Sequence, residues 1–434
     1  MSHPQAPTGP TPPAPNPPAP NPPARTSALA PLRRRNYRLL AIGQAVSNTG
    51  TWMQNIAQGW LVLQLSHGDG TQLGITTALQ LLPILLFGAC GGSLADRFPK
   101  RRLLLLTQTL HGALALAAAL LTATGSATLG TVYALCLALG LTMVVDKPTL
   151  QAFIAEAVGP DDLPSALALN SAVLNLARVA GPALAGPVIA AFGVAPAFAL
   201  NSLSYTVVLA TLLRMDTRAL RPAPAPAGTG RQVRAGLRYV RERPELGLTL
   251  VLVALVAGFG MNFQITTALM ATQVFHCPDT AFGIGSTALA VGAVAGSLLA
   301  ARTRPPEWRR VAGYALAFGT LEAASGLMPD FRTFAMTLVP TGAALLLFMT
   351  AAKARLQLAV APALRGRVMG LYMLASLGTT PLAAPGIGWL CQTAGPRYGL
   401  LLGGTVSALA AVGTGTLLGR RPRTRPTATA ALPA

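Results

Sequence analysis

Residues 91–102 read GGSLADRFPKRR, a short charged stretch between two long apolar runs. The run before it covers 73–95 and the run after it covers 103–124. Either run is long enough to cross the roughly 30 Å hydrocarbon core of a bilayer as a helix. The stretch therefore predicts a loop that joins two membrane-spanning helices at one face of a membrane.

Apolar runs of this kind recur on both sides of the loop along almost the whole chain. Of the 434 residues, 52% are hydrophobic and 11% are charged, against about 25% charged in ordinary soluble domains. We predict an all-α integral membrane protein with twelve transmembrane helices in two six-helix halves. The predicted spans are 37–65, 73–95, 103–124, 129–149, 164–191, 195–214, 247–273, 282–301, 309–327, 331–352, 367–391 and 397–418.

The longest breaks in the apolar pattern predict five parts of the chain. They are a disordered Pro/Ala-rich tail (1–34), a first half (35–214), a linker (215–246), a second half (247–419) and a C-terminal tail (420–434). AVGPDDLPSALALN and AVAPALRGRVMGLY precede the fifth and eleventh spans and are weakly similar. This similarity indicates a duplicated six-helix unit, a plan known among transporters.

A net charge of +20 would suggest a nucleic-acid partner if the protein were soluble. Here the basic residues lie in short loops on one side of the predicted spans, which is the pattern of cytoplasmic loops. We therefore predict a multi-pass protein of the inner or plasma membrane, with both termini in the cytoplasm, the lipid bilayer as a partner and no nucleic acid. The sequence has no phosphate-binding loop, no metal-ligand pattern and no catalytic motif, so we expect neither an enzyme nor a metal site.

Three ionisable residues within the apolar runs are candidates for coupling transport to a driving ion. Arg178 lies near the middle of the fifth span, where an unpaired charge costs at least a few kcal/mol. Glu322 lies toward one end of the ninth span, so an interfacial position is an equal alternative. Asp146 lies near the basic end of the fourth span, where a structural pair with the loop cluster is the alternative.

Polar residues at helical spacing are candidates for lining a cavity, a role that the family resemblance given below implies for the spans that carry them. On the first span they repeat on one face, and a sparser set follows on the seventh span. Hydrogen bonding between helices is the alternative role. The candidates are Gln44, Asn48, Thr51, Asn55, Gln58, Asn262 and Thr266.

The loop at 91–102 resembles the cytoplasmic signature of the major facilitator superfamily. RNYRLLAIGQAVSNTGTWMQ (35–54), the stretch 146–186 and LRGRVMGLYML (364–374) are similar to its drug- and siderophore-exporting branch. RVAGPALAG (178–186) is similar to the Gly-Pro motif of proton-coupled exporters, with Gly181, Pro182 and Gly186 at the matching positions. The residues that match the loop signature are Gly92, Asp96, Arg97, Lys100, Arg101 and Arg102.

This resemblance implies a monomeric secondary transporter that uses alternating access and no cofactor. Its expected activity is efflux of an amphipathic small molecule, driven by a proton gradient. Asp96 would pair with basic groups and hold the cytoplasmic face closed. Two alternatives stay open: a proton symporter that imports a nutrient, and a membrane sensor or lipid-handling protein that transports nothing.

Overall fold

The computed structural model describes residues 29–159, 161–220, 232–277, 280–302, 307–360 and 362–419. Most of the two predicted tails and the middle of the predicted linker lie outside these ranges. Within them the chain is helical and contains no strand. The first six long helices are α1 (Arg35–Leu65), α2 (Gly70–Arg97), α3 (Lys100–Ala123), α4 (Leu129–Val158), α5 (Leu163–Phe192) and α6 (Ala195–Leu213).

The second part of the chain begins with a short helix and contains two spans that are not continuous α-helices. Residues 244–274 alternate between α-helix and π-helix, and residues 362–394 form two helices in series. The elements are α7 (Gln232–Arg241), α8 (Pro244–Leu255), η3 (Val256–Gly260), α9 (Phe263–Leu269), η4 (Met270–Val274), α10 (Thr280–Arg302), α11 (Trp308–Gly326), α12 (Phe331–Ala359), α13 (Pro362–Leu377), α14 (Thr380–Ala394) and α15 (Pro396–Gly419).

Local sequence signals set several of the helix ends. The side chain of Asp69 accepts a hydrogen bond from Thr71 N at the start of α2, and Thr128 and Thr131 form a reciprocal capping box at the start of α4. Gly159 and Gly193 follow α4 and α5 with φ of 75° and 82°, a backbone conformation that residues with a Cβ adopt rarely. These caps limit the turns between helices to a few residues.

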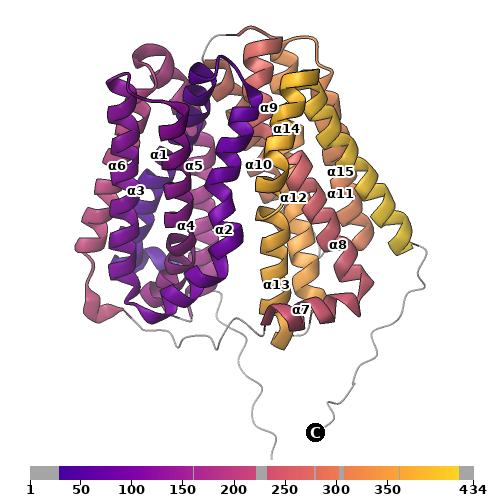
Figure 1. Cartoon of the computed structure of the whole chain (residues 1–434). Coiled ribbons are helices and arrows are strands. Elements are labelled where there is room, and N and C mark those ends of the chain that lie inside the picture. The colour runs from indigo at the N-terminus through magenta and orange to yellow at the C-terminus, as the bar shows by residue number, and fades with distance from the viewer. Residues whose placement is uncertain are drawn as a thin grey trace, which may run out of the picture.

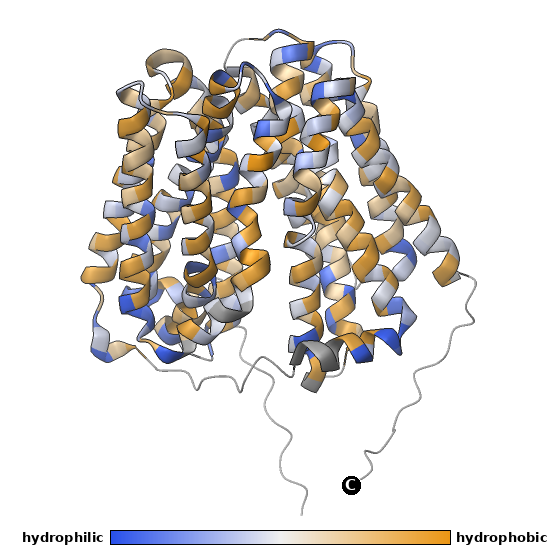
Figure 2. Cartoon of the chain, in the orientation of Figure 1, coloured by the Kyte–Doolittle hydropathy of each residue, from blue (hydrophilic) through white to orange (hydrophobic). Residues whose placement is uncertain are grey.

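The apolar helices form the body of a membrane protein. The twelve predicted ranges coincide with helices apart from a few end residues and the breaks at 261–262 and 378–379, and nine segments of the described residues are by themselves long and apolar enough to cross a membrane. The ranges 37–65, 309–327 and 367–391 do not reach that criterion, so the number twelve stays a prediction. Hydrophobic residues predominate along the helices, as Figure 2 shows, and large exposed side chains such as Leu176 and Leu382 need a lipid environment.

The helices gather into two bundles, one of α1–α6 and one of α8–α15 (Figure 1). We call the lower end in this view the basic end, because α7, which carries Arg238 and Arg241, lies there. Toward the opposite end, α2 packs against α14 and α5 packs against α10. The bundles therefore meet mainly at the end away from the basic residues.

A core of buried side chains from both bundles fills this meeting region. We call it the shared cluster, and its members include Met53, Trp60, Leu73, Ile265, Phe282 and Ile387. Two further clusters each belong to one bundle. One surrounds Phe153 in the first bundle, and the other surrounds Phe318 and Phe348 in the second. The first bundle thus keeps its own core toward the basic end, the second keeps one along its length, and the two share one core at the other end.

Candidate functional site

A cavity of about 290 Å³ lies between the two bundles. Its walls come from α1, α2 and α5 on one side and from residues 261–265, α10, α12, α13 and α14 on the other. Most of the lining is apolar, as in many sites for amphipathic ligands. The polar lining residues are Asn55, Thr77, Arg178, Asn262, Gln264, Ser286, Ser376 and Thr380.

Arg178 is the single charged residue among those that line the cavity. Its guanidinium carbon lies 5.0 Å from the centre of the Trp52 ring, which also lines the cavity. Such stacking holds a guanidinium in place without neutralising it. None of the ion pairs between described side chains involves Arg178, so its charge is available to a ligand.

The predicted polar stripe of α1 is divided among three environments. Asn55 lines the cavity, whereas Thr51 Oγ1 lies 3.0 Å from the Tyr205 hydroxyl inside the first bundle. Asn48 donates to Gln44 O at 2.7 Å, and Gln58 donates to Gln80 Oε1 at 3.1 Å. None of Gln44, Asn48, Thr51 and Gln58 lines this cavity, and their hydrogen bonds lie within the first bundle. Their role in a substrate cavity therefore stays a prediction.

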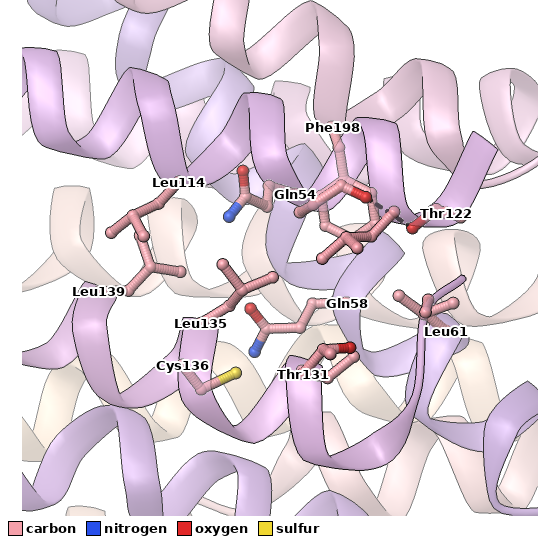
Figure 3. Close-up of a pocket in the computed structure, with 14 residues that line it drawn as sticks. Gln54, Gln58, Leu61, Leu114, Thr122, Thr131, Leu135, Cys136, Leu139 and Phe198 are labelled. Atoms are coloured by element: carbon pink, nitrogen blue, oxygen red, sulfur yellow. Dashed lines mark hydrogen bonds between the residues drawn. The ribbon is translucent and has the colours of Figure 1, made fainter. Parts of the chain in front are cut away.

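Gln58 also lines a second, much smaller cavity inside the first bundle (Figure 3). The figure shows Gln54 and Gln58 facing a mostly apolar wall that includes Leu135, Cys136 and Phe198. Its volume of about 20 Å³ is close to that of a single water molecule. It is too small for a transported substrate, so the cavity between the bundles is the candidate site.

The helix that runs through residues 244–274 is interrupted where it forms the cavity wall. The π-helix η3 ends at Gly260, and Met261 and Asn262 are not helical before α9 begins. Asn262 Nδ2 donates to Gly258 O at 2.7 Å and to Phe259 O at 3.2 Å, which satisfies carbonyls near the break. Thr266 is buried, and its methyl group would lie 3.2 Å from a Cβ on Gly399 of α15, away from the cavity lining.

The structure keeps the three ionisable candidates apart. Asp146 accepts hydrogen bonds from Thr107 Oγ1 at 2.7 Å and Gln108 Nε2 at 2.8 Å, both on α3. Glu322 is only 2% exposed and lies on α11 inside the second bundle, where its Oε2 has no hydrogen-bond partner among the described residues. Neither carboxylate is paired with Arg178 among the described ion pairs.

The signature residues at 92–102 connect helices at the basic end. Lys100 Nζ lies 3.3 Å from Glu156 Oε1 of α4, and Arg101 donates to the carbonyls of Leu212 and Leu213, at the end of α6. A cation is favourable beside the carbonyls that end a helix. Of the other members, Arg97 and Arg102 are exposed, and no atom lies within 4 Å of a Cβ built on Gly92. The backbone of Asp96 belongs to α2, whereas its side chain lies outside the described part of the structure.

The small residues of α5 allow close approach to helices on both sides. A Cβ on Gly181 would lie 2.4 Å from Trp52 Cβ of α1, so the two helices could not pack as they do with a larger residue there. A Cβ on Gly186 would lie 3.4 Å from Thr280 O of α10 in the other bundle, and Pro182 lines the cavity. The predicted Gly-Pro stretch thus lies between α1, the cavity and the second bundle.

The end of the cavity away from the basic end is sealed by contacts between the bundles. A Cβ on Gly74 would lie 2.4 Å from Ala384 O, and one on Gly388 would lie 2.3 Å from Gly70 O. Beyond this seam, Gly70 N donates to Gln392 Oε1 at 3.0 Å, and Gln273 Nε2 donates to Gly68 O at 2.6 Å. Backbone therefore meets backbone where α2 and α14 pack together at this end.

Sequence reasoning missed two parts of this site. Trp52 lies three residues before Asn55 on α1, so helical spacing alone could have placed it in the same wall. Met261 and Gln264 line the cavity because the helix is interrupted between η3 and α9, and no proline marks that interruption. Among the described residues, no group of His, Cys, Asp and Glu side chains is arranged to hold a metal ion.

Comparisons with known proteins place the chain in a family. The transmembrane secretion effector family, of the major facilitator type, matches residues 26–429. The staphyloferrin A transporter of Staphylococcus aureus (strain NCTC 8325 / PS 47) is 24% identical over 253 residues, which are 58% of this chain and 63% of that protein. The uncharacterized MFS-type transporter YfiS of Bacillus subtilis (strain 168) is 24% identical over 410 residues, 90% of this chain and 95% of that one.

A solved structure shows the same fold. The crystal structure of a D-xylose-proton symporter superposes with a TM-score of 0.69 at 14% identity, and the match covers 87% of this chain and 96% of that one. At this identity the likeness concerns the fold alone. The family match extends over nearly the whole chain, including both bundles and the residues that line the cavity between them. The chain belongs to the transmembrane secretion effector family of the major facilitator superfamily, and it is a multi-pass membrane transporter rather than an enzyme.

Proposed function

We propose that this transporter exports an amphipathic small molecule, such as a drug, an antibiotic or a siderophore, in exchange for protons. The two halves, 35–214 and 247–419, alternate in exposing the cavity to either side of the membrane. The observation that supports this best is the cavity itself, which lies between two bundles and is sealed at one end by the Gly74–Ala384 seam. The family's description as secretion effectors supports the direction of export.

The lining of the cavity supports an amphipathic substrate with a carboxylate or carbonyl group. Apolar side chains make up most of the wall, and amides from Asn55, Asn262 and Gln264 add sites for hydrogen bonds. Arg178 supplies a permanent positive charge, because a guanidinium does not lose its proton at physiological pH. A symporter for a highly polar nutrient would need more polar and charged side chains in this wall.

The experiment that tests the function is uptake into membrane vesicles prepared in both orientations. The probe is nalidixic acid, an amphipathic monocarboxylate, with its ethyl ester as the uncharged comparison. A proton-driven exporter takes up the acid into inverted vesicles when their interior is acidic. A symporting importer takes it up into right-side-out vesicles from an acidic exterior, and a sensor produces no flux in either preparation. Either of the last two results would refute proton-coupled export.

We propose further that the basic end faces the cytoplasm. Cys277 lies after η4 at the opposite end and is partly exposed, whereas Cys136 and Cys391 are buried. We expect a membrane-impermeant maleimide to label Cys277 in intact cells. In a Cys277→Ser protein, a cysteine that replaces Arg238 at the basic end should react only after the cells are permeabilised. The orientation would be reversed if the Arg238→Cys protein were labelled in intact cells and Cys277 of the wild type were not.

Asp96 and its basic neighbours form the proposed latch of the cytoplasmic face. Lys100 and Arg101 already tie α3 to α4 and α6 at this end, so the loop lies where a charge can favour one state of the bundles. We expect Asp96→Asn to enter the membrane normally, to slow transport and to make the inner end of α2 more accessible to thiol reagents. Arg38→Gln, which changes an exposed basic residue of α1 outside the signature, is the control. Full transport by Asp96→Asn would leave the loop with a role in topology alone.

A further inference from the structure

Glu322 occupies a pocket in the second bundle that is built around its carboxyl group. A Cβ on Gly260 of η3 would lie 2.9 Å from Glu322 Oε2, and a Cβ on Gly403 of α15 would lie 2.7 Å from Oε1. The same position on Gly260 would lie 2.7 Å from the Phe318 ring and 2.9 Å from Ser407 Oγ. Two glycines thus leave room for a carboxyl group that is otherwise enclosed by an aromatic ring and a hydroxyl group.

No cation accompanies this carboxyl group among the described residues. The described ion pairs join Arg34 to Asp162, Lys100 to Glu156 and Arg238 to Glu242. Glu322 Oε2 and Ser407 Oγ are both buried without a hydrogen-bond partner among the described residues. An unpaired carboxylate in such a place would cost several kcal/mol, whereas a protonated carboxyl group would cost far less.

The charged and titratable groups around α11 lie toward the ends of the packed helices rather than beside Glu322. Arg397 of α15 donates from Nη1 to Gly326 O and Met328 O, about one turn beyond Glu322 along α11, so its guanidinium is held at the end of that helix. η3 carries no titratable residue. The others on α11, α12 and α15 are Arg309, Arg310, Tyr314, Arg332, Lys353, Arg355 and Tyr398.

The segment that touches Glu322 also forms the cavity wall. Gly260, which faces the carboxyl group, is followed directly by Met261, Asn262 and Phe263, which line the cavity. The backbone here lacks the regular hydrogen bonds of an α-helix, and Asn262 Oδ1 is a further buried acceptor without a partner among the described residues. π-Helical turns within α-helices occur often at functional sites because they are easily rearranged.

We propose that Glu322 is the proton-binding site of the transporter and that it acts on the cavity through the interrupted helix at 256–262. In the conformation described here the carboxyl group holds a proton and packs against Gly260. Loss of that proton leaves a carboxylate that needs water or new donors, so η3 and α11 must separate. That movement displaces Met261 and Asn262 and changes the cavity. The inference rests on the proposed proton exchange and names the residue that carries it out.

The test measures the protonated carboxyl group directly, without a transported substrate. The purified protein in liposomes is titrated from acidic to alkaline buffer while infrared difference spectra are recorded, because the C=O stretch of a protonated carboxyl group is separate from that of a carboxylate. We expect a band that is present in the wild type and in Glu307→Gln but absent from Glu322→Gln. Glu307 is exposed at the start of the same helix, so it provides the matched control.

A second variant keeps the carboxyl group and disturbs its surroundings. Gly403→Ala places a methyl group 2.7 Å from the present position of Oε1, so the band should shift and titrate at a different pH. If Glu322→Gln fails to accumulate in the membrane, the shift of the band in Gly403→Ala tests the assignment instead. A band that neither Glu322→Gln nor Gly403→Ala alters would overturn the assignment.

Vesicle uptake separates a failure of this inference from a failure of the proposed function. Glu322→Gln should lose uptake driven by the pH gradient, down to the background of empty vesicles. It should keep the exchange of labelled for unlabelled nalidixic acid, which needs no net movement of protons. If Glu322→Gln responds to the gradient like the wild type, Glu322 is not the proton site. If the wild type itself ignores the gradient, proton coupling fails, even when a band from Glu322 titrates.

Discussion

Arg178→Gln is expected to weaken the binding of nalidixic acid roughly tenfold to a hundredfold and to abolish its transport. A hydrogen bond to a charged group contributes about 1.5–3 kcal/mol, which corresponds to that range in affinity. Arg178 is the single charge among the residues that line the cavity, so no neighbouring lining residue can replace it. Arg178→Lys keeps the charge but loses the planar group that stacks on Trp52, so it should retain partial activity.

The measurement uses the fluorescence of Trp52, which lies in the cavity wall beside Arg178. Nalidixic acid should quench it with lower affinity in Arg178→Gln, whereas the ethyl ester should bind both proteins alike. Trp52→Phe identifies the part of the signal that comes from this residue. If Arg178→Gln binds the acid as tightly as the wild type and still transports it along a pH gradient, Arg178 has only a structural role.

Gly74→Val is expected to block transport while the protein still accumulates in the membrane. A Cβ at this position would lie 2.4 Å from Ala384 O and 2.7 Å from Pro385 Cα, and backbone atoms cannot move aside as a flexible side chain can. The clash exists only where α2 and α14 meet, so it disfavours the conformation sealed at this end. The bundles should then remain apart here, and the cavity should open to the side opposite the basic end.

Two other glycines provide matched controls for this prediction. A Cβ on Gly88, on the same helix, would have no atom within 4 Å, so Gly88→Val should transport normally. A Cβ on Gly292 would lie 1.8 Å from Val339 O within the second bundle, so Gly292→Val should prevent folding rather than select a conformation. The measurement is the rate at which an impermeant thiol reagent labels a cysteine placed at Ser286 in the cavity wall. An unchanged rate in Gly74→Val, together with normal transport, would contradict the expected opening.

Apolar runs alone predicted the positions of the helices, because a helix surrounded by lipid must be apolar along most of its length. They could not predict where the helices end. α4 continues to Val158 and α12 continues to Ala359, several residues beyond the predicted ends at 149 and 352. The added turns include charged residues such as Glu156 in α4 and Lys353 and Arg355 in α12, and they remain helical beside neighbouring helices at the basic end.

The break between α13 and α14 was also missed. The range 367–391 reads as one apolar run, yet the helices separate at Gly378 and Thr379. Gly378 contributes no side chain, and Pro381 in the next turn cannot donate a backbone hydrogen bond. These residues lower the free-energy cost of interrupting the helix. Hydropathy averaged over a span does not detect such a break.

The candidate site was predictable only in part, for a related reason. Helical spacing gave the face of α1 that carries Asn55, but it could not tell the cavity from the interior of the bundle, where Thr51 meets Tyr205. The sequence also left the depth of Glu322 in the membrane undecided. Its position along the span agrees with a carboxyl group at the membrane interface and with one enclosed inside the bundle. Its burial depends on Gly260 and Gly403, which are distant in sequence and become neighbours only when η3, α11 and α15 pack together.

The shared cluster bears on how the two bundles are held to each other. Side chains from both, among them Trp60 and Phe282, interlock at the end away from the basic residues. The peptide between α6 and α7 joins the bundles at the other end, and its sequence is rich in Pro, Ala and Gly. The bundles are thus aligned by side-chain packing at one end, so the peptide sequence at the other end is the natural place to insert a fluorescent reporter domain into this transporter.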